Sequence, residues 1–171
     1  QIEALSATAA KGLTANQIQS FGDGVMFNAA QLSVLTTGQV QAFNETQLGD
    51  LDATHIQALK ATQIGALSAT NFSKLDETQV GALDATQVKG ISTTQLKGLS
   101  ETDMSEFSAA QVGALSVAQL SVISAENFSK LDSSQIGALT TTQIKGLTTT
   151  QLAGMSTTDI GELSTTQVSA L

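Results

Sequence analysis

Side chains capable of chemistry are few in this sequence and form no recognisable catalytic set. The chain of 171 residues contains no Cys and a single His, His55. Without Cys there is no thiolate nucleophile and no Cys-based zinc site, and one His alone does not make a metal centre. His55 stands where most units of a repeat carry Gln, so we interpret it as a surface variant of that repeat, not as a metal ligand or a general base.

Acidic residues occur in close pairs that could suggest general acid–base catalysis. The pairs are Asp50 with Asp52, Asp76 with Glu77, and Glu101 with Asp103. Most of them fall at cap or first-turn positions of the short helices predicted below, where the helix dipole already favours negative charge. A structural role is therefore expected for these carboxylates.

The segment Gly22-Asp23-Gly24 resembles a fragment of a calcium loop, because Gly and Asp recur in such loops. It lacks the further oxygen ligands at set spacing that calcium loops supply, so we interpret it as a bend or capping irregularity. The sequence also contains no nucleophile elbow, phosphate loop or dinucleotide fingerprint. We expect no enzyme activity, no catalytic, cofactor-binding or metal-binding residues, and no cofactor.

Charge and hydropathy exclude two classes of partner. The formal net charge is -8, and the positive groups are seven scattered Lys. No basic stripe is available to neutralise phosphates, so nucleic acid is not an expected partner. The apolar runs are far shorter than the roughly 20 residues that span a bilayer, so no membrane insertion is expected.

A period of eight residues organises the whole chain. A large apolar residue recurs at every eighth position from Leu35 to Leu171, and the frame continues upstream to Leu5. One short unit, residues 21–26, lacks two residues. Numbered from the Leu, a typical unit reads Leu, Ser/Thr/Asp, any, Thr/Ala, Gln, Val/Ile/Leu, any, Gly/Ala. The chain is therefore expected to be one domain, residues 1–171, without linkers.

This unit predicts a very short helix that restarts every eight residues. In a strand, positions 1 and 6 would point to opposite faces, and in a continuous helix the apolar stripe would drift by about 80° per unit. Position 2 carries the preferred N-cap residues, and the Gln three residues later completes a capping box. Positions 1 and 6 are then the two partners of a hydrophobic staple, and Gly or Ala at position 8 lets the chain turn before the next Leu. One unit cannot fold alone, so units must stack on one another over small residues.

A second periodicity indicates how the units stack. Position 8 is usually Gly or Ala, but it is larger and polar or charged at Ser20, Asp50, Lys74, Glu106, Lys130 and Glu162. After correction for the short unit, these positions are alternately four units and three units apart. Position 5 departs from Gln in the last four of these units, at Asn71, Asp103, Asn127 and Asp159.

The alternation predicts an all-α superhelix with about three and a half units per turn, in which the variant units share one side. Contacting units should then lie about 24 to 32 residues apart, and the chain should form a stubby rod of about six turns. The alternative is recent duplication of a seven-unit block, which explains the 56-residue repetition but not the alternation within each block.

The units at Leu139–Gly146 and Leu163–Ala170 resemble octapeptide arrays of very long, adhesin-like bacterial surface and secreted proteins. The resemblance covers nearly the whole chain and lies in the repeat pattern. It implies export to the cell surface or medium and a structural or adhesive role, for example in a biofilm matrix. It implies other domains of the same chain or matrix components as partners, and it supplies no functional residues.

Three functions remain open. The first is a stalk, spacer or adhesive array in an extracellular bacterial protein. The second is a binding module in which Thr at positions 3 and 4 forms a regular hydroxyl lattice that meets a glycan or ice. The third is an intracellular scaffold that holds peptides in a superhelical groove. The sequence contains nothing that identifies a receptor.

Overall fold

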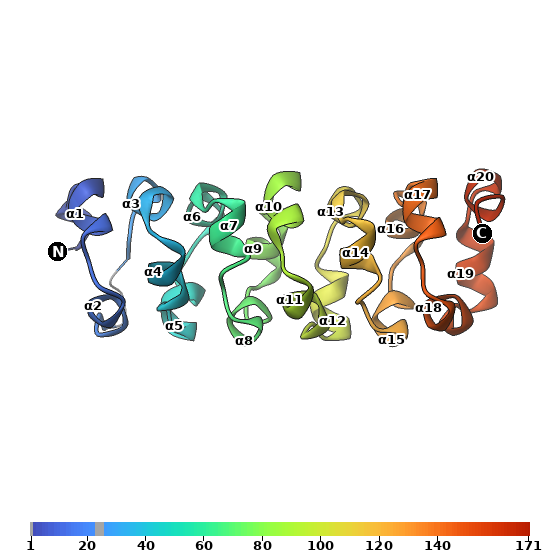
Figure 1. Ribbon diagram of the computed structural model, residues 1–171, viewed down its shortest axis with the longest axis horizontal. Coiled ribbons are helices and arrows are strands. Elements are labelled where there is room, and N and C mark those ends of the chain that lie inside the picture. Colours follow the sequence, from blue (N-terminus) through green and yellow to red (C-terminus); the bar gives the residue numbers. More distant parts are fainter. Residues whose placement is uncertain (1, 23–25) are drawn as a thin grey trace.

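The chain forms a rod of very short helices in a computed structural model that describes residues 2–22 and 26–171, the side chain of Glu3 excepted (Figure 1). The described residues contain one 3-10 turn and twenty α helices and no strand. In chain order the elements are η1 Ile2–Ala4, α1 Ala7–Lys11, α2 Ala15–Gln19, α3 Ala29–Val34, α4 Thr37–Gln41, α5 Glu45–Gly49, α6 Ala53–Ala58, α7 Ala61–Ile64, α8 Ala69–Phe72, α9 Glu77–Gly81, α10 Ala85–Gly90, α11 Thr93–Lys97, α12 Glu101–Ser105, α13 Ala109–Ala114, α14 Val117–Leu120, α15 Ala125–Phe128, α16 Ser133–Gly137, α17 Thr141–Lys145, α18 Thr149–Gly154, α19 Thr157–Glu162 and α20 Thr165–Val168.

Most helices start as the eight-residue pattern predicts. In α11 the Ser92 hydroxyl accepts a hydrogen bond from the Gln95 backbone N–H at 3.2 Å, and the Gln95 Oε1 accepts one from the Ser92 N–H at 2.7 Å. This reciprocal pair satisfies two N–H groups that a helix start leaves without a partner. The same capping box recurs along the rod, which confirms one fresh helix per unit.

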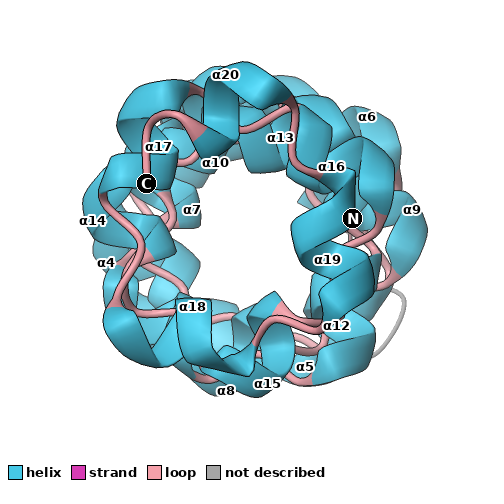
Figure 2. Ribbon diagram, turned by 90° about the vertical axis from the view of Figure 1, so that its right-hand side faces the viewer, coloured by secondary structure: helices cyan, strands magenta, loops and turns pink. Residues whose placement is uncertain are grey.

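The helices wind into a superhelix that closes a turn between three and four units. Helix α7 packs against α10, α10 against α13, and α13 against α16. Viewed along the rod, the helices lie on a ring (Figure 2). At the N-terminal end α1 packs on α3 and α2 on α4, so the contacting helices are two apart in number and not three. The reason is that the short unit, residues 21–26, contributes no helix among its described residues. The contacts between successive turns confirm the predicted spacing of three to four units.

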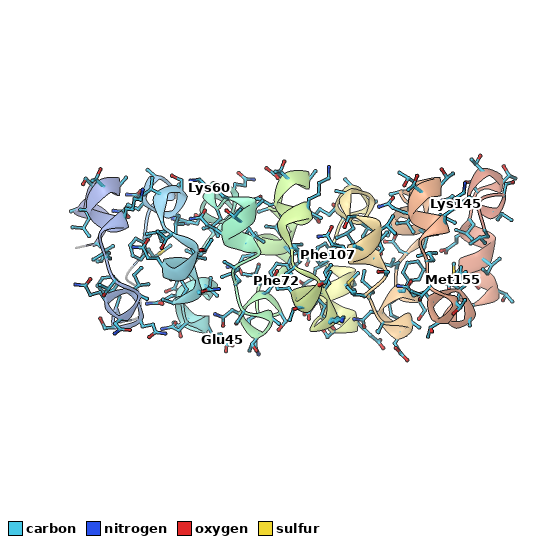
Figure 3. All side chains as sticks on the ribbon, in the orientation of Figure 1. Glu45, Lys60, Phe72, Phe107, Lys145 and Met155 are labelled. Atoms are coloured by element: carbon cyan, nitrogen blue, oxygen red, sulfur yellow. The ribbon has the colours of Figure 1, made fainter. Side chains whose placement is uncertain are left out.

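One continuous hydrophobic core runs through the rod and is filled from positions 1 and 6. Ile91 and Leu96, the staple partners of α11, are both almost fully buried. The rings of Phe72 and Phe107 and the side chain of Met155 point into the rod, whereas Glu45 and Lys145 lie on its outside (Figure 3). Each unit therefore adds two side chains to a core that neighbouring turns share.

Small residues are needed where successive turns of the superhelix come into contact, and not for the change of chain direction at the end of each unit. A Cβ placed on Gly90 would overlap the Ala61 carbonyl oxygen, and one on Gly65 would overlap the Gly90 carbonyl oxygen. The expectation that small residues are needed for the turn itself was wrong. Gly98 and Gly146 at position 8 have φ of -86° and -90°, values that any residue adopts.

The variant units do gather on one side of the rod. Helices α5, α8, α12 and α15, whose units end in four of the six enlarged position-8 residues, lie along the same edge in Figure 1 and in the lower part of the ring in Figure 2. Exposed ion pairs join adjacent turns there, Lys74 to Glu45 at 3.7 Å and Lys130 to Glu101 at 3.5 Å. This arrangement accounts for the alternation between four-unit and three-unit spacings, which block duplication alone leaves unexplained.

Candidate functional site

His55 takes the place of Gln in the capping box of α6. Its Nδ1 lies 3.3 Å from the Asp52 backbone nitrogen and 2.8 Å from the Asp52 Oδ1, and the Asp52 side chain accepts a bond from the His55 N–H. That backbone hydrogen bond, together with the nearby imidazole, lowers the pKa of Asp52. The His55 side chain is only 16% exposed, so it is a partly buried capping residue and not a freely exposed surface residue.

The acidic pairs serve as helix caps and first-turn residues, with one exception. Asp52 and Asp76 are N-caps, and Glu77 is the first residue of α9. Asp50 departs from the expected placement, because it is the C-cap of α5 and its backbone N–H closes that helix. In the remaining pair, Glu101 is the first residue of α12 and Asp103 completes its capping box.

Stacking brings together carboxylates that are far apart in sequence. Glu106, at the end of α12, faces Asp76 and Glu77 at the start of α9 on the preceding turn, and Asp103 lies nearby on its own helix. Burial is the main cause that raises the pKa of Glu106, and the negative charges of the three neighbouring carboxylates raise this pKa further. The Glu106 Oε2 is buried and makes no hydrogen bond among the described residues, and the same is true of the Oε2 of Glu162, the matching residue seven units later.

Sequence inspection missed this cluster because it considered pairs close in sequence. The sequence held only part of the signal, since the predicted stacking sets contacting units 24 to 32 residues apart but does not say which positions face each other. The cluster does not meet the requirements of a metal site: no group of three potential ligands in ranges 2–22 and 26–171 could hold a metal ion.

The segment Gly22-Asp23-Gly24, interpreted above as a bend or capping irregularity, lies largely outside the described residues. Gly22 is described and exposed, whereas Asp23 and Gly24 are not described. Beside this segment the Phe21 and Phe27 rings are 6.1 Å apart, and the Phe27 ring meets Phe43 edge-on at 5.7 Å. The described flanks of the short unit are therefore held by aromatic packing.

The most regular polar feature of the molecule is a ladder of buried Gln side chains, which the sequence analysis recognised only in part. In Gln95 the Oε1 completes the capping box, while the Nε2 donates to the carbonyl oxygens of Ile64 at 2.8 Å and Leu67 at 2.9 Å on the preceding turn. Gln87 and Gln119 make the same pairs of bonds. A buried amide therefore stabilises its own helix and ties it to the turn before it.

The register of these bonds explains the pitch of the superhelix. The two acceptors lie 31 and 28 residues before the Gln, which are position 6 of the unit four back and position 1 of the unit three back. The amide thus spans the junction between those two units, so one turn takes about three and a half units.

Only Gln can supply both the capping acceptor and the donor to the preceding turn at this position. A Glu could accept the capping bond but has no proton to donate to a carbonyl at neutral pH, and Ala could do neither. No unit of the chain carries Glu at position 5. That absence was a signal available in the sequence, because a capping box alone accepts Glu as readily as Gln.

The outer surface carries the polar residues of positions 3 and 4. Thr141, Thr142, Thr149 and Thr150 are all exposed. They occupy the first turns of α17 and α18, where they neither cap a helix nor enter the core. The structure thus places these hydroxyls where a partner could reach them.

Comparisons with known proteins add no relationship: no protein family, no curated protein and no solved structure matches this chain. In the described part of the chain, none of the helices has the length and apolar character needed to cross a bilayer.

Proposed function

We propose that this chain is a non-catalytic structural array, a stalk, spacer or adhesive region of an extracellular bacterial protein. The observation that carries the proposal is the Gln ladder. It binds each turn to the turn before it through the same two acceptors, so the rod is extended by repetition of one interface. A molecule built in this way supplies length and separation between whatever lies at its two ends.

The distribution of polar groups supports a non-catalytic role. The buried amides are used in the capping boxes and the ladder, and the crowded carboxylates around Glu106 are explained by stacking of turns. Location at the cell surface and a part in adhesion rest on the resemblance of the octapeptide units to bacterial surface arrays.

Duplication of one block tests the spacer role. Residues 75–130 comprise seven units, so a second copy inserted after Lys130 preserves the register of the ladder. We expect the maximum dimension measured by small-angle X-ray scattering to grow by about one third, with a thermal midpoint at least as high as before. A chain that grows in width instead of length, or that loses cooperative unfolding, would contradict a spacer.

A binding module is the second candidate, and the exposed Thr residues favour it. The variant for its test replaces Thr141, Thr142, Thr149 and Thr150 with Ala. A spacer should show no saturable binding on a glycan microarray either before or after these changes. Binding that is present in the unmodified chain and lost in the variant would establish the hydroxyl lattice as a recognition surface.

A further inference from the structure

We propose that a pocket near the N-terminal end of the rod binds a small organic dianion, such as a phosphate monoester or a dicarboxylate. The pocket has a volume of about 380 Å³ and is lined by Ala7, Thr8, Lys11, Val34 and Lys60. Two ammonium side chains, one hydroxyl and two apolar side chains form its lining, with no carboxylate among them. This composition is unusual in a chain whose formal net charge is -8.

Lys60 departs from the repeat at a position where the departure weakens its own helix. It is the N-cap of α7, where other units place Ser, Thr, Asp or Asn, and its side chain makes no capping hydrogen bond. An ammonium group at a helix start also opposes the helix dipole. A residue that contradicts local stability in this way, and that lines a pocket, indicates a role other than folding.

The same three positions carry different residues one 56-residue block later. Allowing for the short unit, Lys11 corresponds to Gly65, Val34 to Gly90 and Lys60 to Ser116. At that later place, Gly90 approaches the Ala61 backbone so closely that no Cβ would fit.

Val34 carries a branched side chain at the position of Gly90, and it lines the pocket together with Ala7 of α1. Two departures from the repeat, Val34 and Lys60, therefore meet Lys11, which stands at the variable position 7, in one pocket. The side chains come from α1, α3 and the start of α7, which lie on successive turns along the same edge of the rod (Figure 1).

The size and chemistry of the pocket define the ligand class. Pockets of roughly 300 Å³ or more accommodate small organic molecules, so this one is larger than an inorganic anion requires. Two Lys side chains from different turns can pair with two negative oxygens, while Thr8 offers a hydroxyl and Val34 an apolar surface. This inference is independent of the mechanical role proposed above.

Titration of the full chain followed by ¹H–¹⁵N NMR tests the site, with glycerol 3-phosphate and succinate as probes. We expect saturable shifts at residues 7–11, 34 and 60 with at least one probe, and none with chloride at matched ionic strength. The two probes distinguish a phosphate ligand from a dicarboxylate. If neither saturates these residues, or if chloride reproduces the shifts, the proposal is overturned.

Variants taken from the repeat separate binding from folding. Lys60→Ser and Lys11→Gly install the residues found in the later block, and each should weaken binding at least tenfold. Lys60→Ser should also keep or raise the thermal midpoint, since it restores an N-cap. Lys145→Gly is the matched control, because Lys145 has the same place in its unit as Lys11 but lies far along the rod (Figure 3). Unchanged affinity in Lys60→Ser, or an equal loss in Lys145→Gly, would refute the site.

Discussion

The regular units and the variant units of this rod differ in which side chains complete the capping box and which donate a hydrogen bond to the preceding turn. In a regular unit Gln95 both completes the capping box and donates to the preceding turn. On the variant side, Asp103 completes the box through its Oδ2 at 2.7 Å but cannot donate. Asn71 donates to the Phe43 carbonyl at 2.9 Å, and α8 has no capping box among the described residues.

This division shows that capping and stacking are separate requirements, which only Gln meets together. A side-chain acceptor is enough for the capping box, and a side-chain donor is enough for one hydrogen bond to a carbonyl of the preceding turn. The same side also relaxes the demand for a small residue at position 8. The variant side is therefore where the repeat tolerates change, and the regular side is where its pitch is fixed.

Loss of the donor on the regular side should have the largest effect. Gln95→Glu keeps the capping acceptor but places a carboxylate against the carbonyl oxygens of Ile64 and Leu67, and we expect it to lower the free energy of unfolding by about 3 kcal/mol or more. Chemical denaturation would measure the change. Gln17→Glu is the control, since Gln17 is exposed and its side-chain hydrogen bonds are those of the cap, so it should be nearly neutral. Equal losses at the two positions would contradict a role for the ladder.

Filling the close approach between turns should have the next largest effect. Gly90→Ala drives a methyl group into the Ala61 carbonyl oxygen and should destabilise the fold by about 1–3 kcal/mol. Gly81→Ala is the matched comparison, because nothing lies within 4 Å of a Cβ built there. It should stabilise by up to about 1 kcal/mol through helix propensity. A tolerated Gly90→Ala would show that the turns are not in tight contact at this point.

Restoring the missing donor on the variant side should stabilise the rod. Asp103→Gln lets an amide reach the Phe72 and Leu75 carbonyls of the preceding turn, and should add about 1 kcal/mol in thermal unfolding. Asp103→Asn is the comparison: like Asn71 it gains a donor and loses the box, so it should be close to neutral. If Asp103→Gln destabilises, the variant side has a geometry that excludes the ladder.

The smallest effect should come from the crowded carboxylate. The folded-state pKa of Glu106 lies above its ordinary value of 4.5, so its ionised form destabilises the fold above that pKa, and this penalty is removed as the pH falls through it. Glu106→Gln should therefore stabilise the protein at pH 7 by less than about 1 kcal/mol, because solvent screens a partly exposed group. The difference from the unmodified chain should shrink as the pH falls toward the ordinary range of a glutamate. Glu126→Gln, at an exposed site, is the control, and a pH-independent gain in Glu106→Gln would contradict charge crowding.

Much of the fold could be predicted from the sequence because each unit carries its own local signals. The Ser92 cap, the Gln95 box and the Ile91 staple partner are all read within one unit, and the spacing of Asp50, Lys74 and Glu106 indicated the turn length. Interactions between turns were harder to foresee. The donor role of Gln95 and the crowding at Glu106 depend on which atoms face each other across a turn, and that is set by the superhelix and not by any single unit.

The most direct test of this account is disulfide formation across one turn. A Cβ on Gly98 would lie 3.3 Å from the Ala69 Cβ on the preceding turn, and the chain has no native Cys. Ala69→Cys with Gly98→Cys should form a disulfide under mild oxidation, detected by mass spectrometry of proteolytic fragments. Ala69→Cys with Ala125→Cys, two turns apart, should remain reduced in the monomer. A disulfide between positions 69 and 125, or none between 69 and 98, would contradict a superhelix of three and a half units per turn.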